Sequence, residues 1–184
     1  MILDKIVQKT YRVRMSINTA PHIHEYVVCA NMLVKKHDTY LVIKRSPLKK
    51  YAPGFTAFIG GKVDVGENPY EAAVRELVEE AGVCVKNIRL EAVILEIQPV
   101  KNEPYNWLVF HFSGDYESGE ILSTEEGELV WLTADEIKTS QLFPSVGRVI
   151  QHILDREAGT VFATFGYAGH EAGVETRNIS VCAS

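Results

Sequence analysis

Short runs of apolar and β-branched residues, separated by turn-forming residues, dominate the first two thirds of the chain. Such runs are typical of strands. We predict strands over 25–34, 39–44, 55–59, 106–113 and 129–132, with weaker candidates at 11–15 and 160–167. Residues 83–98 hold two strand-like runs, broken near Lys86 and Asn87. Two segments, 46–54 and 114–128, have the breaker residues or the acidic, glycine-containing composition of loops.

A helix is predicted over 69–81, because the start and stop signals around it agree. Asn68 is a favourable N-cap, Pro69 suits the first helical position, and Glu71 completes a capping box. Gly82 supplies the C-terminal stop. At about 100° per residue, one broad arc of this helix is apolar and should pack against a sheet. The arc consists of Tyr70, Ala73, Val74, Leu77, Val78 and Ala81.

Two further helices follow later in the chain. Thr133 caps a short helix over 134–138, and Pro144 begins a longer one that ends near Gly159. Several strands with a few helices and no regular βαβ alternation indicate an α/β fold of the α+β type, with a mixed sheet. We expect one domain over residues 1–184. Within it, 1–20 form an N-terminal extension or edge strand, and 160–184 a C-terminal extension.

Composition and charge narrow the class of protein. Hydrophobic residues make up 46% and charged residues 23% of the chain, as in an ordinary globular protein. The net charge is −5 and no basic tract occurs, so we expect no nucleic-acid polymer as a partner. No apolar run approaches the roughly 20 residues of a membrane span, and the first residues lack the features of a secretory signal. We therefore expect no membrane partner.

The cysteines also bear on location. Cys29, Cys84 and Cys182 are three in number, widely spaced, and form no CxxC pair. An odd, scattered set favours reduced thiols over a disulfide framework. This pattern predicts a cytoplasmic protein.

Three glutamates of the predicted 69–81 helix share one face. Glu76, Glu79 and Glu80 stand at positions i, i+3 and i+4, where like charges repel each other. A solvated acidic face is the ordinary interpretation of such a pattern. If the face is partly buried, a bound cation would be needed to neutralise it, and an all-oxygen set suits Mg²⁺ or Mn²⁺. Arg75 lies four residues from both Glu71 and Glu79 and can pair with either.

The whole stretch 61–83, GKVDVGENPYEAAVRELVEEAGV, favours the cation site. Its fixed positions read Gly61-x5-Glu67-x7-Arg75-Glu76-Leu77-x-Glu79-Glu80-x-Gly82-Val83. Every fixed position of the Nudix box is filled, so the chain resembles the Nudix hydrolases. The resemblance implies the Nudix fold, a mixed sheet between helices in α/β/α layers. It also implies a divalent-metal pyrophosphohydrolase acting on nucleoside diphosphates linked to another group.

The resemblance implies roles for residues in and around the box. The metal ligands would be Glu76, Glu79 and Glu80, assisted by Glu67 and by the carbonyl of Gly61. The general base would be Glu79 or Glu80, or a glutamate of the loop before the last strand of the sheet. In that loop stand Glu125, Glu126 and Glu128, among which we select Glu126 as the candidate. Arg75 would orient Glu79 by a charge-assisted hydrogen bond.

Substrate binding must involve residues outside the acidic helix. Candidate phosphate partners are Arg45, Lys49, Lys50 and Lys62, and the alternative for each is ordinary surface charge. Aromatic residues that can stack on a base are Tyr51, Phe55, Tyr105 and Trp107. Trp131 is expected in the core, and His111 can face either the core or the pocket. His22 and His24 lack a third metal ligand at suitable spacing.

The substrate class stays open between alternatives. Pro99, sixteen residues after Val83, is similar to the proline of ADP-ribose-hydrolysing relatives, whereas the compact length and box entry resemble MutT-type nucleoside triphosphatases. We favour an ordinary or oxidised nucleoside triphosphate, with ADP-ribose or a nucleotide sugar as the alternative. A catalytically silent nucleotide-binding module is the alternative of another class, and an RNA-end hydrolase is disfavoured by the acidic charge. A homodimer is possible, as in relatives.

Overall fold

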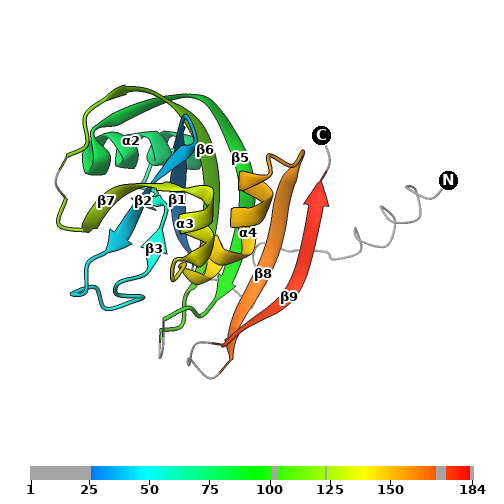
Figure 1. Ribbon diagram of the computed structural model, residues 1–184. Helices are drawn as coiled ribbons and strands as arrows, with labels where there is room; N and C mark the ends of the chain where they lie inside the picture. Colours follow the sequence, from blue (N-terminus) through cyan, green and yellow to red (C-terminus); the bar gives the residue numbers. More distant parts are fainter. Residues whose placement is uncertain (1–25, 101–102, 123, 169–172, 183–184) are drawn as a thin grey trace.

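The computed structural model describes residues 26–100, 103–122, 124–168 and 173–182 (Figure 1). Its helices are α2 (Pro69–Ala81), α3 (Ala134–Thr139) and α4 (Pro144–Leu154). Its strands are β1 (Tyr26–Lys36), β2 (Thr39–Arg45), β3 (Thr56–Ala57), β4 (Ile59–Lys62), β5 (Val83–Ile97), β6 (Asn106–Gly119), β7 (Gly127–Thr133), β8 (Thr160–Ala168) and β9 (Gly173–Cys182). Across these described ranges, no helix combines the length and hydropathy needed to cross a bilayer.

The described strands form one mixed sheet. Its main order is β3-β2-β1-β6-β5-β8-β9, with β4 paired to β1 and β7 paired to β2. The β1–β6 and β5–β8 pairs are parallel, and the others are antiparallel. One edge of β1 is divided, because its residues 29–32 pair with β4 and its residues 34–36 pair with β2. This division places the glycines of β4 in the middle of the sheet.

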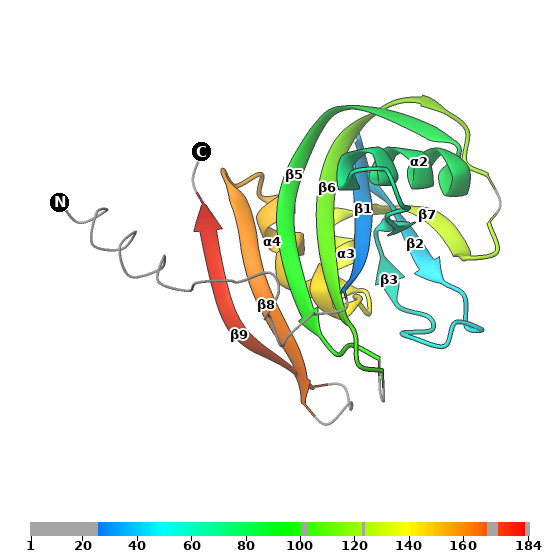
Figure 2. The ribbon, with the colours of Figure 1, turned by 180° about the vertical axis from the view of Figure 1, so that it is seen from behind.

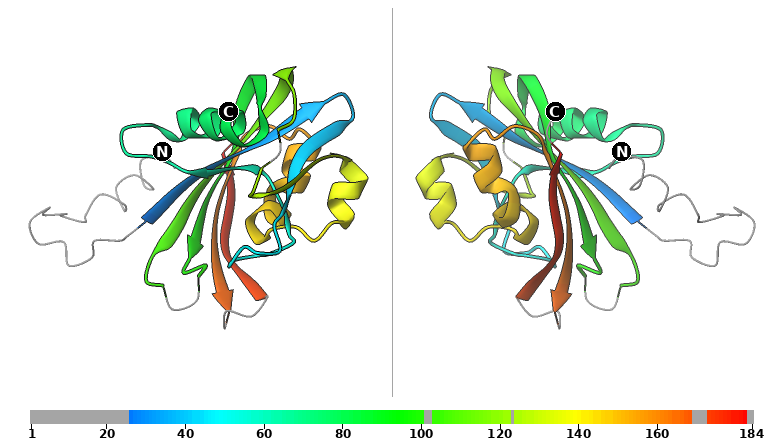
Figure 3. Two further views of the ribbon diagram at one scale, coloured as in Figure 1. Left: turned by 90° about the vertical axis from the view of Figure 1, so that its left-hand side faces the viewer. Right: turned by 90° about the vertical axis from the view of Figure 1, so that its right-hand side faces the viewer.

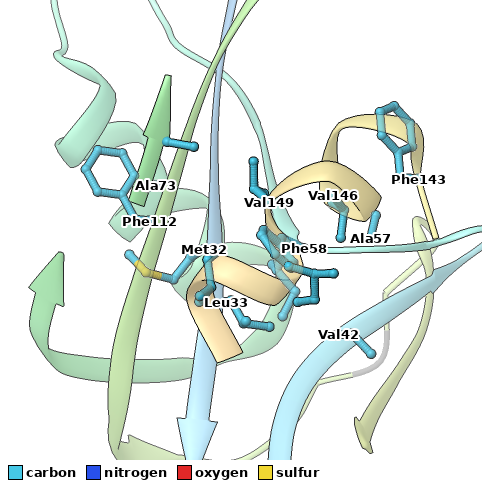
Figure 4. Packing of buried hydrophobic residues seen from close by; sticks show 14 of the residues in the cluster. Met32, Leu33, Val42, Ala57, Phe58, Ala73, Phe112, Phe143, Val146 and Val149 are labelled. Carbon is cyan, nitrogen blue, oxygen red and sulfur yellow. The ribbon is translucent and has the colours of Figure 1, made fainter. Parts of the chain in front are cut away.

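The sheet lies between two helical layers, which Figure 3 shows from both sides. Helix α2 packs mainly on β4 and β1, and it lies in front of the sheet in Figure 2, with α3 and α4 behind. Figure 4 shows the same division around β1, with Ala73 and Phe112 on one side and Val146 and Val149 on the other. The predicted fold class, a mixed sheet between helices in α/β/α layers, is confirmed.

One hydrophobic core runs through both sides of the sheet. Met32, Leu33, Leu77, Ile94 and Phe165 are each at most 1% exposed. Burying a side chain of this size stabilises the folded state by roughly 1.5–3 kcal/mol. Because Phe165 belongs to β8, this strand shares the core of the preceding elements.

Helix α2 has the predicted bounds, and its caps explain them. The Asn68 side chain accepts hydrogen bonds from the backbone N–H groups of Tyr70 and Glu71, both at 3.0 Å. The Glu71 carboxylate in turn accepts from the Asn68 N–H at 3.0 Å, which completes the capping box. Gly82 ends the helix with a left-handed φ of 69°.

The predicted apolar arc of α2 is wrong at two positions. Tyr70 and Val78 are 51% and 44% exposed, whereas Ala72, outside the predicted arc, is fully buried. The buried residues of α2 are Ala72, Ala73, Leu77 and Ala81. At about 100° per residue, the buried face is turned toward Ala72 relative to the predicted arc, and Glu76 and Glu80 lie on it between Ala72 and Ala73. This placement is the reason that both glutamates are partly buried.

Several strand predictions differ from the structure. The two runs predicted within 83–98 form one strand, β5, which ends at Ile97 and in which the predicted break is a register shift between Lys86 and Arg89. The predicted 114–128 loop is shorter, because β6 continues to Gly119 by pairing with the start of β5. The 55–59 strand is divided into β3 and β4, and β9 was not predicted. The 11–15 segment and the pair His22 and His24 lie outside the described residues.

The helix after Pro144 and one tryptophan also differ in detail. α4 ends at Leu154 instead of near Gly159, since Arg156 adopts a left-handed φ of 53° and the chain turns there. Trp131 is only partly buried. It packs at the edge of the core against Tyr116, at 6.0 Å between ring centroids, with the Lys36 ammonium group 5.6 Å from its ring.

Candidate active site

Arg75 binds three glutamates at once on the flank of α2. Its Nε donates to Glu67 Oε2 at 3.1 Å and its Nη2 to Glu67 Oε1 at 2.6 Å. Its Nη1 donates to Glu76 Oε1 at 2.9 Å and to Glu79 Oε2 at 3.1 Å. Its Nη2 also donates to the Lys62 carbonyl at 3.1 Å. These charge-assisted bonds tie the loop before α2 to the helix, and they lower the pKa of Glu67.

Glu76 lies against the backbone of Gly61, where β4 passes beside α2. A Cβ built on Gly61 would come within 2.5 Å of Glu76 Oε1, so glycine is required to leave the carboxylate in place. The Glu76 side chain is only 15% exposed. Burial raises the pKa of Glu76, and the contact with Arg75 opposes that effect.

Glu80 has a strongly perturbed ionisation equilibrium. Burial, followed by the negative charges of Glu76 and Glu126, raises its pKa to about 7. The backbone N–H of Gly60 and the charge of Lys49 oppose this rise. A partly buried carboxylate among like charges is stabilised by a cation, and perturbed groups of this kind cluster at functional sites.

The segment 125–128, around the start of β7, brings one of its three glutamates near the acidic helix. Glu126 forms an ion pair with Lys49, and its charge raises the pKa of Glu80. Glu125 and Glu128 are exposed. The structure therefore places Glu126 beside the candidate metal ligands.

The chemistry of these donors fits a hard divalent cation. The set consists of the carboxylates of Glu67, Glu76, Glu79 and Glu80 together with the carbonyl of Gly61, all of them oxygens. Within the described residues, no three His, Cys, Asp or Glu side chains are already gathered around one point, and Arg75 is bonded to three of these carboxylates. The space beside Gly61 and the close negative charges of Glu76 and Glu80 are the features that suit a cation.

A cavity of about 210 Å³ lies between the sheet and the start of α4, and Gly60, Gly61 and Lys62 of β4 form part of its wall. It is lined by Val27, Cys29, Asn31, Arg45, Ala57, Phe58, Gly60, Gly61, Lys62, Glu96, Trp107, Val109, Phe143, Ser145 and Val146. A mostly apolar lining with a few polar groups is usual for small-molecule sites. Gly60 and Gly61 thus connect the wall of the cavity to the acidic helix, because α2 packs on β4 and Glu76 lies against Gly61.

Arg45 supplies a cation to the wall of this cavity. Its Nη2 donates to the Tyr51 carbonyl at 3.1 Å, and its guanidinium carbon lies 5.5 Å from the centre of the Phe143 ring. Burial lowers the pKa of Arg45. Its Nε has no hydrogen-bond partner among the described residues. A partly buried guanidinium with a spare N–H suits an anionic ligand group.

The family assignment follows from the extent of the match as well as from the box. Residues 23–153 match the family model described as the NUDIX domain. The chain belongs to the Nudix family. It is thus a Nudix hydrolase, as the motif at residues 61–83 predicts.

Relatives and solved structures agree with this assignment. The uncharacterized Nudix hydrolase YvcI of Bacillus subtilis is 29% identical over 124 residues, which cover 65% of this chain and 77% of YvcI. The NAD-capped RNA hydrolase NudC of Escherichia coli is 27% identical over 132 residues, so 69% of this chain matches less than half, 46%, of NudC. The crystal structure of a MutT protein from Bacillus halodurans is similar with a TM-score of 0.70 and 25% identity, covering 84% of this chain and 97% of that one.

Only some of the predicted substrate-binding residues of this Nudix hydrolase line the cavity. Arg45 and Lys62 line the cavity. Tyr51 supports it, because its ring lies edge-on to Trp107 at 5.2 Å and to Phe143 at 5.4 Å. The predicted residues that do not line it are Lys49, Lys50, Phe55 and Tyr105.

The sequence reasoning missed part of the Nudix cavity. Asn31 and Cys29 line it from β1, and their alternation with apolar neighbours is a signal that could have identified them. Glu96 lines it from β5 and is fully buried, but only the long-range pairing of Glu96 with Trp107 places it there. His111 belongs to the core. It is fully buried and edge-on to Phe58, and burial lowers its pKa to about 3.

Proposed function

We propose that this Nudix hydrolase is a Mg²⁺-dependent pyrophosphohydrolase that cleaves a phosphoanhydride bond of a nucleoside triphosphate by attack of water at phosphorus. The observation that carries the proposal is the position of Glu76 and Glu80, which are partly buried beside Gly60 and Gly61, two glycines that also belong to the wall of a cavity. Buried like charges of this kind cost free energy unless a cation or an anionic substrate with its metal occupies the site.

Glu67, Glu76, Glu79, Glu80 and the Gly61 carbonyl are proposed to hold the metal. When bound, Mg²⁺ supplies charge neutralisation at the phosphate oxygens and a more acidic water. Arg75 keeps three of the glutamates oriented through the contacts described above. Manganese, with the same preference for oxygen ligands, is expected to substitute.

Glu126 is proposed as the general base. It lies on the loop that faces the acidic helix, and the Lys49 ammonium group holds its carboxylate. A base must reach the attacking water, and a loop opposite the helix can supply one that is not itself a metal ligand. Glu79 and Glu80 are the alternatives that the resemblance left open.

The substrate proposal rests on the cavity. Its volume of about 210 Å³ is suited to one base or a group of similar size, and Arg45 and Lys62 supply positive charge near the acidic helix. Trp107 and Phe143 provide the aromatic surfaces. A nucleoside triphosphate places its base in such a cavity and its phosphates toward Gly61. ADP-ribose or a nucleotide sugar is the alternative substrate.

The whole chain is proposed to act as one domain, since β8 adds Phe165 to the common core and β9 pairs with β8 beyond the Nudix match. A cytoplasmic location and the possible homodimer stay predictions from the sequence.

A substrate panel with controlled metal tests the function. Release of phosphate or pyrophosphate is measured from nucleoside triphosphates and 8-oxo-dGTP, and formation of the nucleoside monophosphate and sugar phosphate from ADP-ribose and nucleotide sugars, each with Mg²⁺, Mn²⁺ or a chelator. We expect metal-dependent turnover that falls at least about 100-fold in Glu79→Gln. Glu71→Gln, a capping residue of the same helix, should keep its activity. Binding of nucleotides without turnover of any of them would instead support the silent module.

A further inference from the structure

A second cavity, of about 190 Å³, lies at the other end of α4. It is lined by Leu33, Lys35, Tyr40, Asn87, Arg89, Glu91, Ser113, Gly114, Asp115, Ile153 and Arg156. Both cavities lie on the α4 side of the sheet, because residues 27, 29 and 31 of β1 line the first and residues 33 and 35 line the second. Helix α4 separates them, with residues 145 and 146 at the first cavity and residue 153 at the second.

Glu91 is a buried acid in the wall of this second cavity. The register of β5 shifts between Leu90 and Ala92, and this shift turns Glu91 into the interior, where it is 2% exposed. One carboxylate oxygen, Oε1, accepts a hydrogen bond from the Ser113 hydroxyl. The other, Oε2, has no hydrogen-bond partner among the described residues. A buried acceptor left in this state is destabilising, and a donor on a ligand would recover that cost.

Positive side chains surround the same cavity. Arg89 has its Nη2 3.6 Å from Glu91 Oε2, beyond hydrogen-bond distance, and this nitrogen donates to the Glu157 carbonyl at 3.3 Å. Arg156 contacts Asp115 at 3.3 Å. With Lys35, the wall therefore holds three cations and two carboxylates, in a chain whose net charge is −5.

The mixture of positive and negative side chains in the wall argues against a ligand that carries a single charge. A bare metal ion would meet Lys35, Arg89 and Arg156, and a bare anion would meet Glu91 and Asp115. A molecule with both charges satisfies both sets. Its volume must also be small, since ordinary cofactor pockets are larger than this cavity.

We propose that the second cavity binds a small zwitterion of the size of an amino acid, with its ammonium group on Glu91 and its carboxylate or phosphate group on Arg89 and Lys35. Nothing in the Nudix reaction requires this site. It is therefore separate from the hydrolytic site, although α4 contributes to both.

Binding to the full chain tests the proposal directly. Saturation-transfer NMR and calorimetry are performed with the common amino acids and phosphoethanolamine, and with acetate and methylammonium as probes of one charge each. We expect at least one zwitterion to bind with a millimolar or lower Kd and both single-charge probes to bind much more weakly. If no zwitterion binds at concentrations of tens of millimolar, the cavity is a solvent-filled recess and the proposal is overturned.

Variants separate this cavity from the first one. Glu91→Gln keeps the side-chain shape and the acceptor for Ser113, and should raise the Kd at least about tenfold. Glu117→Gln, exposed on the same β6 strand as Ser113, should leave it unchanged. If Glu91→Gln does not fold, Arg89→Ala must show the same loss. Unchanged binding in the folded variant, or displacement of the zwitterion by a nucleotide, would overturn the assignment.

Discussion

Arg75 and Glu67 meet through two parallel hydrogen bonds, from Nε to Oε2 at 3.1 Å and from Nη2 to Oε1 at 2.6 Å. This bidentate contact joins α2 to a loop residue eight positions earlier. Only a planar guanidinium can make it while also donating to Glu76 and Glu79. The contact thus fixes the position of the acidic helix relative to Gly61.

Replacing Arg75 tests its role as an orienting residue. In Arg75→Lys the positive charge remains, but the planar guanidinium with its parallel N–H donors is lost. We therefore expect kcat to fall roughly 10–100-fold, with a smaller change in the KM for nucleotide. Thermal unfolding without metal should change little, because the side chain is partly exposed. Arg148→Lys, exposed on α4, is the matched control. Equal kcat in Arg75→Lys and wild type would contradict the role.

Glycine at position 61 should be required for activity. In Gly61→Ala the new Cβ would come within 2.5 Å of Glu76 Oε1, so the carboxylate must move, and Mg²⁺-dependent turnover should fall by at least about tenfold. In Gly147→Ala, inside α4, the nearest atom lies at an ordinary 3.6 Å. That control should keep its activity and gain about 0.4–1 kcal/mol in the free energy of unfolding. Comparable activity of the two variants would exclude the steric argument.

The base assignment can be tested by a pH–rate profile. If Glu126 accepts the proton of the attacking water, Glu126→Gln should lower kcat roughly 100-fold or more and remove the acidic limb of the profile. Glu128→Gln, exposed in the same region, should retain both the rate and the limb. Loss of the Lys49 ion pair alone would cost less than about 1 kcal/mol. An unchanged limb in Glu126→Gln would transfer the role to Glu79 or Glu80.

His111 should make the protein sensitive to acid. Burial lowers its pKa from the ordinary 6.5 to about 3, so between these values the unfolded chain takes up a proton that the folded chain does not. The free energy of unfolding should therefore fall by about 1.4 kcal/mol per unit as the pH drops through this window. Below pH 3 and above 6.5, this residue should add no slope.

The variant His111→Phe removes this contribution. Neither ring nitrogen has a hydrogen-bond partner among the described residues, and Phe58 lies edge-on to the ring, so phenylalanine should be accommodated. Urea unfolding at pH 5 and pH 7 should give a smaller difference in the variant. His37→Asn, in an exposed turn at a φ of 54°, should keep the wild-type difference. The same slope in His111→Phe would place the acid sensitivity elsewhere.

Local signals explain which elements could be predicted from the sequence. The bounds of α2 follow from Asn68, Pro69, Glu71 and Gly82, whose effects act within one helical turn. The continuation of β6 to Gly119 was missed because it depends on pairing with the start of β5. Strand partners far apart in the chain decide such elements, so composition alone favoured a loop.

The candidate site was likewise only partly predictable, because part of it depends on residues far apart in the chain. The box itself supplies Glu67, Arg75 and the helix glutamates, and their contacts agree with the spacing. The cavity wall instead combines Asn31, Glu96 and Phe143 from three distant segments, which only the folded sheet and α4 bring together. The exposure of Val78 was also unpredictable, since the face of α2 that packs on the sheet is turned toward Ala72 and away from Val78 relative to the predicted arc.

Helix α4 gives the molecule a rigid connection between distant positions. Its 11 residues span roughly 16 Å, with one end at the active-site cavity and the other at the cavity around Glu91. Because one rigid element contributes to both walls, a substitution that shifts α4 is expected to change both cavities, whereas a lining residue outside α4 can be changed at one of them alone.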